Sequence, residues 1–187
     1  MMNACADISK NNISVRNWAA LHIPLAMAGA FTALLLGLFI ANIRINYTPS
    51  EPMGLYRVLP FTGVNTDIQR GSLIEFCHHG IKNKFMIRGA CEDGYAPFVK
   101  EVIGMPGDTV TVADSGVSVN GVGVPHSRPL RFSIADPTLA MPVLRGSFTL
   151  NEGQYWVLGG QNTERSYDSR YFGAVSAKDI RSIAVKE

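Results

Sequence analysis

Residues 98–108 read FVKEVIGMPGD, an apolar run that contains a lysine and ends in a turn signal. Successive side chains of a β-strand point to opposite faces, so Lys100 would share one face with Phe98 and Val102. The Pro-Gly pair at 106–107 would stop the strand. The stretch therefore predicts a strand over 98–103 that carries a lysine among apolar side chains.

Lys100 has two interpretations. Burial among apolar groups penalises the charged amine and lowers its pKa, which makes lysine a usable general base. Alternatively, lysines on edge strands keep sheets from aggregating. The other candidate bases, His78, His79 and His126, stand in no recognisable catalytic setting. We therefore expect Lys100 to be the base.

A serine upstream stands in an unusual backbone setting. Residues 47–56 read YTPSEPMGLY, so Ser50 lies between two prolines that favour a stiff, non-helical chain. A serine hydroxyl is a weak nucleophile until a base takes its proton. We predict that Ser50 is the nucleophile and Lys100 its base, although an ordinary turn serine is the alternative.

An uncharged segment precedes this serine. Residues 17–43 contain no Asp, Glu, Lys or Arg, and a helix over 23–43 would rise roughly 31 Å, enough to cross a bilayer. A cleaved signal peptide normally has a shorter apolar region, about 7–15 residues. We expect a retained anchor at 23–43, a cytoplasmic N-terminus at 1–22 and a periplasmic domain at 44–187. The positive charges on the two sides of the segment differ little and do not decide its orientation. We choose this orientation mainly because the long C-terminal part must carry the function.

The charge balance excludes one class of partner. From Ile45 onward the chain has 14 Lys plus Arg and 14 Asp plus Glu, whereas binding of nucleic acid calls for a basic surface. An extended peptide suits a neutral surface better. We expect a peptide substrate, contact with the bilayer and no nucleic acid.

Three cysteines divide between the two sides of the expected membrane. Cys5 would lie in the cytoplasm, whereas Cys77 and Cys91 would share an oxidising periplasm. We predict that Cys77 and Cys91 are bonded, the alternative being two buried thiols. The chain has no C-x-x-C, and the adjacent His78 and His79 would face opposite sides of a strand, so neither metal nor cofactor is expected.

The rest of the chain has the pattern of a mainly β domain. We expect a hairpin from 72–77 and 84–88, strands at 109–112 and 117–120 with an Asn-Gly turn, and later strands at 154–159 and 181–185. A short helical turn is expected at 177–180. Four prolines make 125–145 an irregular excursion. Short strands with Gly and Pro between them favour a partly open barrel or sandwich.

Three stretches together resemble one family. Residues 100–108 (KEVIGMPGD) are similar to the lysine box K-R-V-I-G-x-P-G-D of the type I signal peptidases, which are membrane-anchored serine–lysine proteases. Residues 160–170 (GQNTERSYDSR) resemble the box G-D-N-x-x-x-S-x-D-S-R, although composition alone would indicate a surface loop. General signal peptidases usually have Met directly after the serine, whereas this chain has Glu51. Residues 50–56 (SEPMGLY) look instead like the S-x-P-x-G-x-Y pattern of TraF-type conjugal-transfer peptidases.

The resemblance implies roles for six residues. It implies that Ser50 is the nucleophile, Lys100 the base, Thr48 an oxyanion-hole hydroxyl, Ser166 the hydroxyl that orients the lysine, and Asp168 with Arg170 a supporting ion pair. This chain departs from the family pattern at Glu51 (usually Met), Glu101 (often Arg) and Gln161 (usually Asp).

The resemblance also implies a function. The chain is expected to be an inner-membrane serine endopeptidase that processes exported precursors, in particular a pilin precursor in conjugative transfer. Some TraF-type enzymes join the new ends into a cyclic pilin. The alternatives are a general type I signal peptidase and a catalytically silent, membrane-tethered assembly factor.

Overall fold

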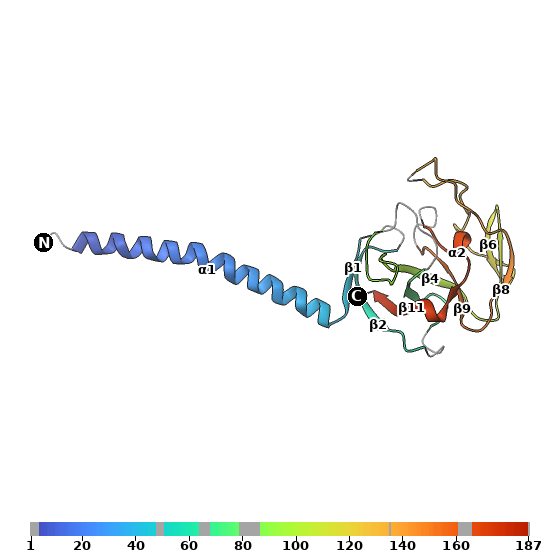
Figure 1. Ribbon diagram of the computed structural model, residues 1–187, viewed down its shortest axis with the longest axis horizontal. Helices are drawn as coiled ribbons and strands as arrows, with labels where there is room; N and C mark the ends of the chain where they lie inside the picture. Colours follow the sequence, from blue (N-terminus) through green and yellow to red (C-terminus); the bar gives the residue numbers. More distant parts are fainter. Residues whose placement is uncertain are drawn as a thin grey trace. The chain divides into compact units, whose positions relative to one another are not determined.

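The computed structural model describes residues 4–47, 51–63, 68–78, 87–134, 136–160 and 166–186 (Figure 1). The chain divides into two compact units, Met1–Ile43 and Arg44–Glu187. The elements are α1 (Ala4–Ile40), β1 (Ile43–Asn46), β2 (Gly54–Pro60), β3 (Leu73–Phe76), β4 (Phe98–Gly104), β5 (Thr109–Ala113), β6 (Gly116–Val119), β7 (Val122–Gly123), β8 (Gly146–Thr149), β9 (Gln154–Leu158), α2 (Ser169–Phe172), β10 (Val175–Ser176), the 3₁₀ turn η3 (Ala177–Asp179) and β11 (Ile180–Lys186).

The first unit is a long helix with one apolar segment. His22–Ile40, 19 residues with a mean hydropathy of 2.2, is long and apolar enough to cross a membrane, since it rises about 28 Å. The helix ends at Ile40, whereas the sequence predicted an apolar helix up to residue 43. Asn42 has a φ of 55°, the left-handed conformation in which Asn commonly follows a helix end.

The second unit is built from two open antiparallel sheets. The larger has the strand order β1-β2-β11-β3-β4-β9-β10, and the smaller has the order β7-β6-β5-β8. In Figure 1 the smaller sheet, in which β6 and β8 are labelled, lies on the side of this unit away from β2 and β11. Neither sheet closes on itself, so the expected mainly β, partly open architecture is confirmed.

Two apolar clusters fill the unit, and β9 contributes to both. The cluster of the larger sheet contains Ile68, Ile74, Phe76, Val102, Tyr155, Val157, Val175 and Ile180. The cluster under the smaller sheet contains Val110, Val112, Val117, Val119, Leu150 and Trp156. Gly104 ends β4 against the second cluster, where a Cβ atom would stand 2.8 Å from Cβ of Trp156. A side chain at position 104 would therefore clash with this cluster.

The turn after β4 holds the two sheets together through one carboxylate. Asp108 accepts hydrogen bonds from Met105 N–H (2.6 Å), from Arg70 Nη2 (2.7 Å) and from Asn120 Nδ2 (2.7 Å). Burial raises the pKa of Asp108, but the three hydrogen bonds outweigh burial, and the pKa is lowered below its usual value. The last residues of the lysine box therefore have a structural role, because they connect the two sheets.

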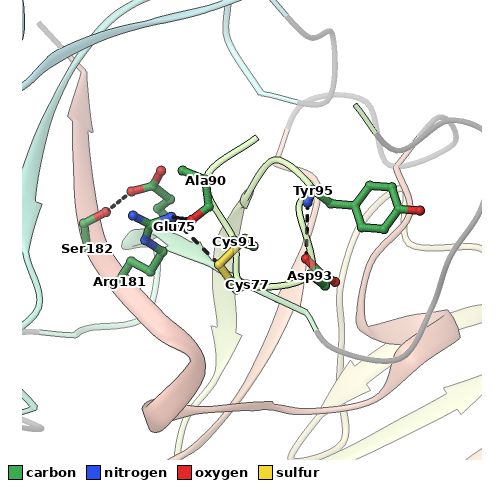
Figure 2. Close-up of a disulfide and its surroundings, with 8 residues drawn as sticks. All are labelled: Glu75, Cys77, Ala90, Cys91, Asp93, Tyr95, Arg181 and Ser182. Carbon is green, nitrogen blue, oxygen red and sulfur yellow. Dashed lines mark hydrogen bonds between the residues drawn. A yellow bond between two sulfur atoms is a disulfide. The ribbon is translucent and has the colours of Figure 1, made fainter. Parts of the chain in front are cut away.

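The cysteine bond is confirmed, and its surroundings differ from the expected hairpin. Cys77 and Cys91 are joined by a disulfide (Figure 2). Arg181 of β11 donates to Ala90 O (3.0 Å) beside it. The strand neighbours of β3 are β11 and β4. Of the expected partner run 84–88, residues 84–86 lie outside the described residues, and Arg88 bridges to Tyr95.

The other strand predictions agree with the structure to within a residue or two. β4, β5, β6, β9 and β11 lie where short apolar or alternating runs predicted strands, and η3 forms the expected turn. Asn120 and Gly121 both have positive φ in the turn between β6 and β7, as an Asn-Gly hairpin requires. The described part of 125–145 forms no named strand, and one isolated bridge joins Phe132 to Ala140.

Candidate active site

Lys100 lies in the middle of the larger sheet. Its strand β4 is flanked by β3 and β9, and Ile74 of β3 stands directly opposite it. The side chain is 5% exposed. The interpretation of Lys100 as an edge-strand lysine is therefore wrong, because strands cover β4 on both sides.

Burial sets the protonation of this lysine. Desolvation lowers the pKa of Lys100 below its ordinary value, while the negative charges of Asp168 and Glu51 raise it and the Arg170 guanidinium lowers it. The net direction is downward. A larger fraction of the amine is then neutral near pH 7 than in an exposed lysine, which is the state that accepts a proton.

A fully buried ion pair lies next to the lysine. Asp168 and Arg170 are both 0% exposed, with Nε 2.8 Å from Oδ1 and Nη2 2.8 Å from Oδ2. Asp168 caps α2 by accepting from the Arg170 N–H, and it also accepts from Gly159 N–H (3.2 Å) at the end of β9. The pair thus fixes the segment that follows residues 161–165 against the strand beside Lys100.

Ser166 lies in the same buried layer. It is 3% exposed, and its carbonyl accepts a hydrogen bond from Arg170 Nη2 (3.3 Å). Its hydroxyl is buried and has no hydrogen-bond partner within the described part of the chain. A buried hydroxyl without a partner is uncommon in folded proteins, and this distinguishes Ser166 as a candidate site residue.

Ser50 and Thr48 lie outside the described residues, and the described chain continues at Glu51. The side chain of Asn46 in β1 donates to the carbonyl oxygens of Glu51 and Pro52, at 3.2 Å each. The Tyr56 hydroxyl donates to Pro52 O at 2.7 Å. Asn46 and Tyr56 therefore hold the chain directly after Ser50.

The structure also brings together two of the positions that depart from the family pattern. Glu51 is 3% exposed and accepts a hydrogen bond from Gly160 N–H at 2.9 Å. A Cβ atom on Gly160 would lie 2.6 Å from Glu101 Oε2 and 2.8 Å from Glu51 Oε2. The two carboxyl groups therefore come close to the same glycine, and a side chain at position 160 would displace them.

These carboxyl groups are unusual in their acidity. Burial is the largest influence on Glu51 and raises its pKa. The hydrogen bond from the Gly160 N–H and the charge of Lys100 lower this pKa, whereas the charges of Glu101 and Asp168 raise it. The result is a pKa of about 7. Desolvation also raises the pKa of Glu101. No short-range pattern in the sequence indicates that Glu51 lies near Glu101. The one signal is that both residues differ from the family boxes.

Ser169, which belongs to the same box, has a structural contact that the sequence did not indicate. Its hydroxyl accepts a hydrogen bond from Val157 N–H at 2.9 Å, and the residue is 0% exposed. This contact ties α2 to β9. Position 161, the third departure, lies outside the described residues.

Comparisons with known proteins found sequences similar to this chain. The sequence profile described as signal peptidase, peptidase S26, matches residues 15–186. Plasmid transfer protein TraF of Escherichia coli is 30% identical over 169 residues, which cover 84% of this chain and 90% of that protein. Signal peptidase I of Bacillus caldolyticus is 37% identical over 94 residues, covering 44% of this chain and 48% of that one.

A solved structure is related as well. The crystal structure of a signal peptidase I from Enterococcus faecalis V583 is 26% identical and covers 62% of this chain and 95% of that chain, with a TM-score of 0.38. The profile match extends over nearly the whole described β unit and includes both Lys100 and the Asp168–Arg170 pair. The chain therefore belongs to the signal peptidase S26 family.

Proposed function

We propose that this chain is a membrane-anchored serine endopeptidase in which Ser50 attacks the scissile carbonyl and Lys100 takes the serine proton. The observation that carries the proposal is the burial of Lys100 in the sheet interior, which lowers its pKa. Glu51 follows Ser50 directly in the chain, and its charge acts on Lys100. This proximity supports a place for Ser50 within reach of the lysine.

The proposed reaction passes through an ester. Ser50 Oγ bonds to the carbonyl carbon while its proton moves to Lys100 Nζ, and the Thr48 hydroxyl and Ser50 N–H stabilise the oxyanion. Lys100 then returns the proton to the leaving amine as the peptide bond breaks. Water attacks the ester with Lys100 again as base, which releases the product and restores Ser50.

Ser166 and the ion pair support the base in this proposal. The Ser166 hydroxyl, buried and without a partner among the described side chains, would orient the neutral amine of Lys100 toward Ser50. Asp168 and Arg170 would hold the segment that carries Ser166. The proposal gives these residues orienting roles, with no transfer of a proton through the ion pair.

We place the enzyme in the inner membrane with its β unit in the periplasm. The segment His22–Ile40 would be the anchor. The disulfide between Cys77 and Cys91 favours an oxidising compartment for the second unit. In this orientation residues 1–22 are cytoplasmic and residues 44–187 are periplasmic.

The natural substrate in this proposal is a pilin precursor of a conjugative system. Relatives named plasmid transfer and conjugal transfer protein support it, as does the sequence of residues 50–56. The precursor would bind as an extended strand at an edge of the sheet, through main-chain hydrogen bonds and small pockets for alternate side chains. A general signal peptidase would accept many precursors with an A-x-A site instead.

An acid-quench experiment tests the nucleophile and the substrate class together. The full-length chain in detergent micelles is mixed with a pilin precursor peptide or with a synthetic A-x-A signal peptide, and is quenched at short times. Peptide mapping should find an ester on Ser50, formed faster from the pilin precursor. An ester on another residue would contradict the nucleophile, and equal or faster acylation by the A-x-A peptide would contradict the substrate class.

A further inference from the structure

Glu51 and Glu101 approach each other from segments far apart in the sequence. Glu51 follows the candidate nucleophile, and Glu101 follows the candidate base on β4. Both carboxyl groups lie close to Gly160: Glu51 accepts a hydrogen bond from its N–H at 2.9 Å, and a Cβ atom on Gly160 would stand 2.6 Å from Glu101 Oε2. Glu51 is 3% exposed, whereas Glu101 is partly buried, so water screens the pair in part.

Carboxylates that lie near each other oppose each other's ionisation. The Glu101 charge is accordingly one of the influences that raise the pKa of Glu51, after the larger effect of burial. The resulting pKa of about 7 leaves Glu51 partly protonated near neutral pH.

We propose that Glu51 is a positioning residue for the peptidase reaction, whose ionisation is opposed by Glu101 on the other side of Gly160, and that Glu51 thereby controls how much negative charge faces the Lys100 amine. This inference rests on the proposed role of Lys100 as the base. The charged groups that face Glu51 are Lys100 and Glu101 on β4 and Asp168 before α2, and Tyr56 on β2 lies within its electrostatic range.

The protons on Glu51 and Lys100 have two possible arrangements, and Glu101 influences which of them is favoured. In one, Glu51 keeps its O–H and Lys100 is a neutral amine. In the other, the O–H bond of Glu51 breaks, a third N–H bond forms on Lys100, and the result is a carboxylate beside an ammonium that cannot accept the proton of Ser50. The negative charge of Glu101 disfavours the second arrangement because it would place two carboxylates together.

The two carboxyl groups therefore have opposite effects on the base. Glu51→Gln removes the charge that stabilises the ammonium, so the acid limb of kcat/KM should move to lower pH. Glu101→Gln lets Glu51 ionise more readily, so the limb should move to higher pH. Each shift should be about one pH unit, which is roughly tenfold in rate at a pH below the limb. The double variant should resemble Glu51→Gln, because Glu101 acts through Glu51.

The experiment measures kcat/KM against pH for the full-length enzyme in micelles, with the precursor peptide that it cleaves fastest. The midpoint of the limb does not depend on how much of a variant is folded, so partial misfolding leaves the test intact. Glu92→Gln, which removes an exposed carboxylate, is the matched control and should leave the midpoint in place.

The outcomes separate the two proposals. Opposite shifts of the limb for Glu51→Gln and Glu101→Gln support the proposal that Glu101 acts on the base by opposing the ionisation of Glu51. Shifts in the same direction, or no shift, overturn it while the limb of the unmodified enzyme still reports Lys100. If Lys100→Ala retains cleavage with the same limb, the base itself is misassigned and the proposed function fails.

Discussion

Arg170 and Asp168 form a bidentate ion pair with both side chains fully buried, at 2.8 Å for each of its two N–O contacts. The arginine also donates to Arg128 O (2.9 Å) and Ser166 O (3.3 Å), so its guanidinium group binds one carboxylate and two backbone carbonyl groups. Two further segments are thereby tied to the pair, and one of them carries Ser166.

Loss of this arginine should destabilise the domain strongly. Arg170→Leu leaves the Asp168 carboxylate buried without its partner, and should lower the free energy of unfolding by about 3–5 kcal/mol. Urea unfolding of the full-length chain in micelles measures this. Arg145→Leu is the matched control, because its pair with Asp114 is exposed to water and should contribute far less to stability. Equal losses in the two variants would contradict the account.

The disulfide should affect stability more than chemistry. The bond closes a short loop, with a sequence separation of 14, and such a cross-link is worth about 3 kcal/mol. Cys77→Ser with Cys91→Ser should therefore melt earlier yet cleave at a near-normal rate at low temperature. Alkylation with and without reductant, followed by peptide mapping, should find Cys5 reactive at once and the other two only after reduction. Thiols at 77 and 91 that react without reductant would refute the bond.

The strands were predictable from local patterns, whereas the contacts between distant segments were not. β5 and β6 follow from the alternation of apolar residues, and β4 and β9 from short apolar runs. The turn at 120–121 follows from its Asn-Gly pair. The pairing of β3 with β11 depends on packing across the whole sheet, and 72–77 therefore looked like one arm of a local hairpin.

The site residues were likewise predictable where they belong to one continuous motif, and their long-range contacts were not. The lysine and the ion pair could be named because their boxes are continuous in sequence. The meeting of Glu51 with Gly160 joins residues 109 positions apart, and no periodicity carries that information. The same holds for Asn46 and Tyr56, whose hydrogen bonds to the backbone at 51–52 depend on how β1 and β2 enter the sheet.

Activity should rise with pH through the range in which Lys100 loses its proton. Desolvation lowers the pKa of Lys100, with a smaller contribution from Arg170, and only the neutral amine above that pKa accepts the serine proton. The limb should therefore lie well below pH 10.5, the ordinary lysine value. The measurement is kcat/KM from pH 6 to 9. A flat profile, with chemistry shown to be rate-limiting, would argue against a titrating lysine.

The acyl-enzyme should be resolved by water, which gives a linear product. Aminolysis competes only where an amine is held beside the ester at a high effective concentration, and a pilin precursor with both ends at the membrane is the case in which that could occur. Mass spectrometry of the mature product decides. A linear product with a free N-terminus is expected, and a product lighter by one water with no free N-terminus would show cyclisation instead.

The central claim is that Ser50 and Lys100 act as one catalytic unit. The most direct measurement is the cleavage rate of the precursor by Ser50→Ala, Lys100→Ala, Lys100→Arg and the Ser50→Ala/Lys100→Ala double variant, each purified as the full chain and checked for folding by urea unfolding. All four should lose activity, Lys100→Arg included because arginine stays protonated, and the double variant should be little worse than either single one. Normal cleavage by a folded Ser50→Ala or Lys100→Ala enzyme would contradict the claim.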